Sequence, residues 1–275
     1  MRNASVVLGV GNSVLRNRVY TALLLAGLTA VTIFWAPLWL FAVMFAIAAS
    51  LGAYEWAAFA GWGTFWHRAG YVAGLVLCIL LSTTQREYWA QFIGILCVVW
   101  TFGFASIALH PRFSNVFKTK WLLVVLGWSL LLGAWICLVS LFEIDNGRLW
   151  LFWLFLLTTA TDVGAFFWGR SFGRTALAAT ISPGKTREGA LGGITLALLI
   201  CGPALYLGGV LTIYETIGFT LFMSVVSILG DLFESLLKRV SGVKDSGNIL
   251  PGHGGLLDRI DSIIAVLPFL VWSVA

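Results

Sequence analysis

Residues 121–142 read WLLVVLGWSLLLGAWICLVSLF and contain no charged side chain. A bilayer core of roughly 30 Å is crossed by about 20 apolar helical residues, because each residue of an α-helix adds about 1.5 Å. The run is therefore predicted to be a transmembrane helix. The rest of the chain has the same character: 60% of its 275 residues are hydrophobic, 11% are charged, and its mean hydropathy is +0.94. This composition excludes an ordinary soluble domain.

Working outward from this run, we expect an all-α, polytopic integral membrane protein with about nine transmembrane helices. The predicted spans are residues 19–35, 38–60, 69–84, 90–109, 121–142, 149–169, 189–211, 216–237 and 261–275. We expect two regions, the N-terminal and middle transmembrane helices in residues 1–148 and a catalytic transmembrane region in residues 149–275. The four cysteines all lie in apolar runs without a CxxC pair, which favours packing over disulfides or metal binding.

The Lys and Arg residues predict the orientation of the chain. If the N-terminus is cytoplasmic and the spans alternate, every Lys and Arg except Arg86 and Arg148 lies on the cytoplasmic side, as the positive-inside rule requires. We therefore expect a multi-pass protein of a bacterial-type inner (plasma) membrane, with its C-terminus outside. The net charge of +5 then reflects topology and anionic lipid, and we expect no nucleic-acid partner. The longest polar connections, residues 170–188 and 238–260, fall on the cytoplasmic side.

Carboxylates gather in residues 227–262, SILGDLFESLLKRVSGVKDSGNILPGHGGLLDRIDS, the densest charged stretch of the chain. Asp231 and Glu234 share one helix face, and Asp258 and Asp261 share another at the start of the last span. Hard oxygen ligands suit Mg²⁺, so we interpret Asp231, Asp258 and Asp261 as candidate ligands of Mg²⁺, with room for a second cation. The alternatives are ion pairs at the end of the preceding helix, and helix capping by Asp258 and Asp261.

The loop before Asp258 is rich in glycine. Glycine lets backbone N–H groups approach an anion closely, but a connector rich in turns also contains glycine. His253 lies among these glycines, where it binds phosphate, acts as an acid or base, or only hydrogen-bonds within the loop. The loop by itself therefore leaves both phosphate binding and a plain connector open.

A second polar segment follows the span that contains Asp162. A carboxylate inside an apolar run is a candidate functional residue, because charge is costly in a bilayer. Farther on, Lys185 and the hydroxyls of Ser182 and Thr186 precede a span, whose helix N-terminus favours a triphosphate. The GK[ST] pattern is present, but the upstream glycine and the βαβ pattern of a P-loop are missing, so a solvated basic loop is the alternative. Glu55 is another acid within a predicted span.

Residues 235–261, SLLKRVSGVKDSGNILPGHGGLLDRID, resemble the signature of phosphatidate cytidylyltransferases (CDP-diacylglycerol synthases) without a gap. The resemblance covers residues 158–268, and the earlier spans are similar mainly in hydropathy and in the pair Glu55-Trp56. Two further segments look like that family, residues 182–189 and 230–235. The chain departs from the family's usual residues at three positions: Val163, Phe166 and Arg187.

This resemblance implies the reaction CTP + phosphatidate → CDP-diacylglycerol + pyrophosphate, in phospholipid biosynthesis. It implies Mg²⁺ as the cofactor, CTP, phosphatidate and membrane lipid as partners, and a homodimer. On this basis we assign as catalytic residues Asp231, Asp258, Asp261, Lys244 and His253. We assign as substrate-binding residues Asp162, Ser182, Lys185, Thr186, Lys238, Arg239, Asp245, Gly252, Gly254, Gly255 and Arg259.

Two other functions remain open. A CTP-dependent kinase of a lipid alcohol, such as polyprenol or phytol, is distantly similar in the C-terminal spans and yields a phospholipid and CDP. A transporter or channel fits intramembrane acids such as Asp162 and Glu55. Against a transporter, paired inverted repeats are missing and the polar residues cluster on one face of the membrane.

Overall fold

The chain is a bundle of helices, as the composition predicts. The computed structural model describes residues 24, 26–243, 245–247, 249 and 254–275. Its longer helices are α2 (Leu38–Trp56), α3 (Phe65–Thr83), α4 (Trp89–Ala108), α5 (Lys120–Glu143), α6 (Gly147–Phe172), α7 (Arg187–Leu207), α8 (Ile213–Val240) and α9 (Leu257–Val274). Two short 3₁₀ turns, η1 (Arg86–Tyr88) and η2 (Ser114–Lys118), precede α4 and α5. The all-α, polytopic fold class is confirmed.

Seven helices within the described residues, α2 to α8, are long and apolar enough to cross a membrane. The first predicted span corresponds to a shorter apolar helix, Ala26–Trp35, and its earlier residues lie outside the described part of the chain. The last predicted span corresponds to α9, whose first two turns carry Asp258, Arg259 and Asp261. Each predicted span therefore overlaps a helix, while the count of nine membrane crossings stays a prediction.

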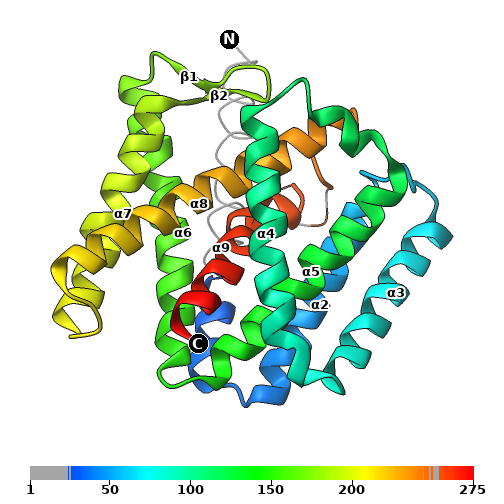
Figure 1. Cartoon of the computed structure of the whole chain (residues 1–275), viewed down its shortest axis with the longest axis horizontal. Helices are drawn as coiled ribbons and strands as arrows, with labels where there is room; N and C mark the ends of the chain where they lie inside the picture. Colours follow the sequence, from blue (N-terminus) through cyan, green and yellow to red (C-terminus); the bar gives the residue numbers. More distant parts are fainter. Residues whose placement is uncertain (1–23, 25, 244, 248, 250–253) are drawn as a thin grey trace, which may run out of the picture.

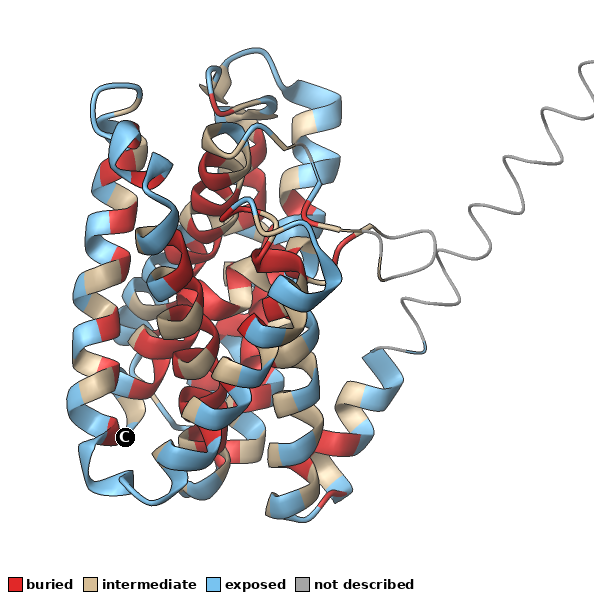
Figure 2. Cartoon of the chain, turned by 90° about the vertical axis from the view of Figure 1, so that its right-hand side faces the viewer, coloured by how far each residue is buried: buried red, intermediate tan, exposed pale blue. Residues whose placement is uncertain are grey.

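Helix α9 lies in the middle of the bundle (Figure 1) and packs against α2, α4, α5, α6 and α8. Helices α3 and α7 lie at opposite edges of the molecule. Buried residues line the inside of the bundle and exposed ones face outward (Figure 2). Because α2, α4 and α5 all contact α9, the two predicted regions, residues 1–148 and 149–275, share one core. The boundary between them stays a prediction.

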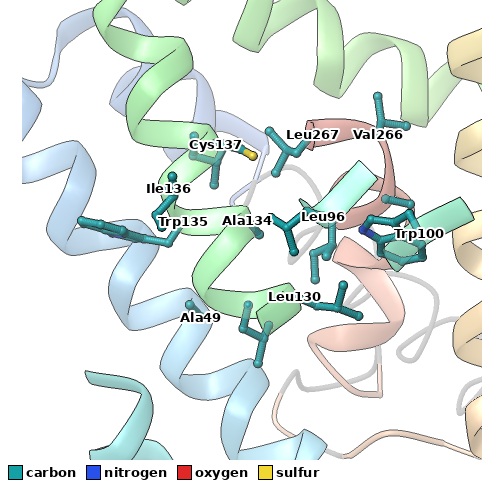
Figure 3. Packing of buried hydrophobic residues seen from close by; sticks show 14 of the residues in the cluster. Ala49, Leu96, Trp100, Leu130, Ala134, Trp135, Ile136, Cys137, Val266 and Leu267 are labelled. Carbon is teal, nitrogen blue, oxygen red and sulfur yellow. The ribbon is translucent and has the colours of Figure 1, made fainter. Parts of the chain in front are cut away.

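Part of the core is shown in Figure 3, where aliphatic and aromatic side chains of α2, α4, α5 and α9 pack together; α3, α6, α7 and α8 contribute further buried residues. Trp135 of α5 donates from its indole N–H to the carbonyl of Ala42 at 2.9 Å, which satisfies the ring's polar atom inside the bundle. All four cysteines are free thiols; Cys137 and Cys201 are buried, and Cys78 and Cys97 are half-buried. Large apolar side chains on the outer faces are exposed, as expected for helices that face lipid.

The polar connections lie at two ends of the bundle. The turns with Arg86 and Arg148 lie at the same end as the C-terminus, whereas the connections after α6 and α8 lie at the other (Figure 1). The connection after α6 contains an antiparallel hairpin that the sequence reading did not predict, β1 (Ala176–Ala178) and β2 (Ser182–Thr186). The connections after α6 and α8 thus lie at the end of the bundle that the basic residues predict to be cytoplasmic.

Candidate active site

Three carboxylates meet where α8 and α9 cross. Gly230 allows the close approach, because a Cβ at this position would lie 3.1 Å from the carbonyl oxygen of Asp261. As a result Asp231, Glu234 and Asp261 offer one oxygen each within 4.8 Å of one another. Within the described part of the chain, Glu234 Oε1 is buried without a hydrogen-bond partner. Crowded hard oxygen atoms, one of them unsatisfied, fit a divalent cation such as Mg²⁺.

Asp258, which the spacing also suggested as a metal ligand, lies outside this group of three. Its Oδ1 accepts from Lys238 Nζ at 2.6 Å. Its Oδ2 accepts from the Ser246 hydroxyl at 2.9 Å and from the backbone N–H groups of Ser246 and Gly255, each at 3.3 Å. The carboxylate is thereby tied to the loop in front of α9. Glu234 is the third acid of the group, beside Asp231 and Asp261. In the sequence, its i, i+3 spacing from Asp231 already indicated that these two acids share a helix face.

Lys238 bridges the two groups of acids. Its ammonium lies 3.1 Å from Glu234 Oε2 and 2.6 Å from Asp258 Oδ1, and the lysine side chain is only 13% exposed. The predicted phosphate contact is therefore also a charge that balances two partly buried carboxylates. The ion pairs at the end of α8, which were the alternative interpretation, are therefore present. The phosphate contact of Lys238 stays a prediction.

The hairpin brings the second polar segment to the same place. Lys185 of β2 forms an ion pair with Asp231, so residues from two different pairs of spans meet. Arg239 donates from Nε to the carbonyl of Ile181 at 3.1 Å, which ties the end of α8 to the hairpin turn. Thr186 caps α7, since its hydroxyl accepts from the N–H of Gly189 at 3.1 Å. Ser182 begins β2 and is half-buried.

An apolar cavity of about 580 Å³ lies between helix Ala26–Trp35, α2, α5, α6 and α9, and its lining includes none of the three grouped carboxylates. Asp162 and Arg259 line this cavity together, among mostly aliphatic and aromatic neighbours. Arg259 and Asp261 are two residues apart on α9, so the cavity and the group of three acids lie on different faces of the same turn of this helix. The cavity itself gave no sequence signal, because its walls come from five separate segments.

The loop between α8 and α9 is described in part. Asp245 is exposed, and Gly254 adopts a left-handed φ of 82° that favours glycine. Gly255 is one of the backbone donors to Asp258. Three predicted site residues lie outside the described residues: Lys244, Gly252 and His253. Glu55, left without a role in the sequence reading, reaches this loop from α2.

Comparison with known proteins identifies the family of this chain. The model of the cytidylyltransferase family matches residues 16–275. The chain is 35% identical to a phosphatidate cytidylyltransferase of Pseudomonas aeruginosa over 281 residues, covering 94% of this chain and 97% of the relative. It is 32% identical to the enzyme of that name from Haemophilus influenzae, covering 93% and 96%. A relative of the same name from Bacillus subtilis is 43% identical over 154 residues, about half of each chain. The chain belongs to the cytidylyltransferase family.

Proposed function

We propose that this chain is a phosphatidate cytidylyltransferase, which makes CDP-diacylglycerol and pyrophosphate from CTP and phosphatidate in phospholipid biosynthesis. The observation that carries the proposal is that α9 contributes both to the group of three carboxylates and to the wall of an apolar cavity. A reaction between a nucleotide and a lipid needs such a place, because the phosphates require cations while the acyl chains stay in the bilayer. The family and the full-length relatives point to the same reaction.

Asp231, Glu234 and Asp261 would hold Mg²⁺ in this proposal. The bound ion supplies neutralisation of the negative charge on the phosphates and on the pyrophosphate that leaves. Asp258 stays a predicted ligand, but its four bonds to Lys238, Ser246 and Gly255 favour a role in holding the loop. Room for a second cation also stays a prediction.

The chain's own cations then position the phosphates. Lys185 lies at the rim of the group of acids, where its partner is Asp231. With Asp231 holding a cation, the ammonium of Lys185 would be free to hold a phosphate of CTP. Lys238 keeps its place between Glu234 and Asp258 and adds positive charge at the same point. A phosphate oxygen of phosphatidate attacks the α-phosphorus of CTP, the bond to the pyrophosphate breaks, and CDP-diacylglycerol forms.

The cavity is the proposed site for the acyl part of phosphatidate. Its volume of about 580 Å³ lies within the usual range of small-molecule sites, roughly 300–1,000 Å³. Asp162 and Arg259 stand at its polar part, where the lipid phosphate would meet the nucleotide. We expect the lipid to enter sideways between helices at the cytoplasmic face of a bacterial inner membrane.

A double-label assay tests the proposed function. Purified protein is incubated with Mg²⁺, CTP labelled at either the α- or the γ-phosphorus, and either phosphatidate or a lipid alcohol (polyprenol or phytol), and the lipid phase is counted. The expected result is label in the lipid from α-labelled CTP only, because the γ-phosphorus leaves in pyrophosphate. Transfer of γ-label to polyprenol or phytol, with none from α-labelled CTP, would instead identify a lipid-alcohol kinase. Nucleotide-independent flux across liposomes, without labelled lipid, would favour a transporter.

A further inference from the structure

We propose that Glu55 is a positioning residue that reaches from α2 to hold the loop in front of α9 in its active arrangement. Glu55 lies near the end of α2, outside the predicted catalytic region, and only 1% of it is exposed. Burying a carboxylate is costly unless hydrogen bonds compensate. The groups that supply them belong to the segment between α8 and α9, far along the chain.

The first contact caps α9. The N-terminal N–H groups of a helix lack partners within the helix, and the residue before α9 is Leu256, whose side chain has no acceptor. Glu55 Oε2 accepts from the N–H of Leu257 at 2.9 Å. A carboxylate at this position also interacts favourably with the helix dipole. Glu55 thus caps α9 from a different helix and fixes where its first turn begins.

The second contact is with the loop itself. The hydroxyl of Ser246, which is 4% exposed, lies 3.4 Å from Glu55 Oε2 and 2.9 Å from Asp258 Oδ2. Gly247 packs its backbone against the same carboxylate, since a Cβ there would collide with Glu55 Oε1 and lie 2.8 Å from Cδ. The loop therefore follows the surface of Glu55, and only glycine fits at 247 while Glu55 is present.

These contacts form one polar chain across the protein. It runs from Glu55 through Ser246, Asp258 and Lys238 to Glu234, with donor–acceptor distances between 2.6 and 3.4 Å. Glu234 belongs to the group of three carboxylates. A shift of the loop at Glu55 is transmitted to Lys238 and from there to the acids. Glu55 touches none of the reacting groups, so its effect is on their placement.

The test combines activity with hydrogen–deuterium exchange, and only its activity arm rests on the proposed function. Glu55→Ala should lower kcat about tenfold to a hundredfold, the loss expected when catalytic groups shift by about 1 Å, with KM for phosphatidate nearly unchanged. Exchange of the peptide 245–258 should become faster, while peptides of α3 and α4 exchange as in the wild type. Glu55→Gln keeps an acceptor for Leu257 and should restore most of kcat and the slow exchange.

Gly247→Ala supplies a second, steric arm. With Glu55 present the added methyl group collides with the carboxylate, so this variant should resemble Glu55→Ala in both activity and exchange. In the double variant the space is open, so Gly247→Ala should add almost nothing to Glu55→Ala, which is the mark of coupled residues. Glu143→Ala, which removes an exposed ion pair with Arg86 at the other end of the bundle, is the matched control and should match the wild type.

Three results would overturn the inference. Wild-type kcat and exchange in Glu55→Ala would show that the contact has no effect. Faster exchange in α3 and α4 as well would show general destabilisation. A Glu55→Gln variant with slow exchange but no activity would show a direct chemical role. If the wild type makes no CDP-diacylglycerol, the proposed function fails. The exchange rates of the wild type, Glu55→Ala, Gly247→Ala and the double variant then still decide whether Glu55 holds the loop.

Discussion

Helices α3 and α9 are similar in length and in apolar content, yet they occupy opposite environments. Helix α3, Phe65–Thr83, buries only Tyr71, Leu75 and Ile79, one stripe along a single face. Helix α9, Leu257–Val274, is surrounded by five other helices and is buried along most of its length. In a membrane protein, apolar content therefore does not distinguish a helix that faces lipid from one that forms the core. The difference lies in the acidic residues, because α9 carries Asp258 and Asp261 in its first two turns whereas α3 contains no acid.

The largest effect that this comparison predicts is at Asp261 of α9. Asp261→Asn removes one of three grouped carboxylates, and we expect the rate of label transfer from α-labelled CTP to fall by more than about a hundredfold. The protein should still insert in the membrane and elute as a single species, because Asn is nearly isosteric with Asp. Activity within a fewfold of the wild type would remove Asp261 from the cation site.

We expect a smaller effect from a glycine that packs against α9 than from Asp261, and almost none from a glycine on the exposed side of α3. Gly230→Ala of α8 forces a methyl group against Ala265 and the backbone of α9, and overpacking of this kind costs about 1–3 kcal/mol. Gly70→Ala of α3 is the matched control, since a Cβ there meets nothing within 4 Å. We expect a lower melting temperature and reduced activity for Gly230→Ala, and an unchanged or slightly higher melting temperature for Gly70→Ala. Equal effects at the two sites would contradict the close contact of α8 with α9.

Much of this arrangement could be predicted from the sequence. Long apolar runs marked the helices, since the bilayer imposes their length, and the densest group of charges marked the end of the bundle where the candidate site lies. The family resemblance singled out the segments 182–189 and 230–235 separately, and the ion pair of Lys185 with Asp231 brings them together.

Other features depend on packing between distant segments, which spacing along the chain does not encode. Asp258 and Glu234 are both acids at helical spacing from another acid, and only the crossing of α8 with α9 shows which one joins Asp231 and Asp261. The cap on α9 comes from Glu55, because the residue before that helix cannot cap it. The hairpin was missed because its strands are short and contain Pro183 and Gly184, residues that are depleted in strands.

Binding of Mn²⁺, a spectroscopic substitute for Mg²⁺, tests the central claim most directly. Electron paramagnetic resonance on the purified protein measures bound and free ion in the wild type and in Asp231→Asn, Asp261→Asn and Asp258→Asn variants. We expect binding by the wild type and by Asp258→Asn, and affinity reduced more than about tenfold in the other two variants. Loss of Mn²⁺ binding in Asp258→Asn with normal binding in Asp261→Asn would contradict this assignment and identify Asp258 as a ligand of the ion.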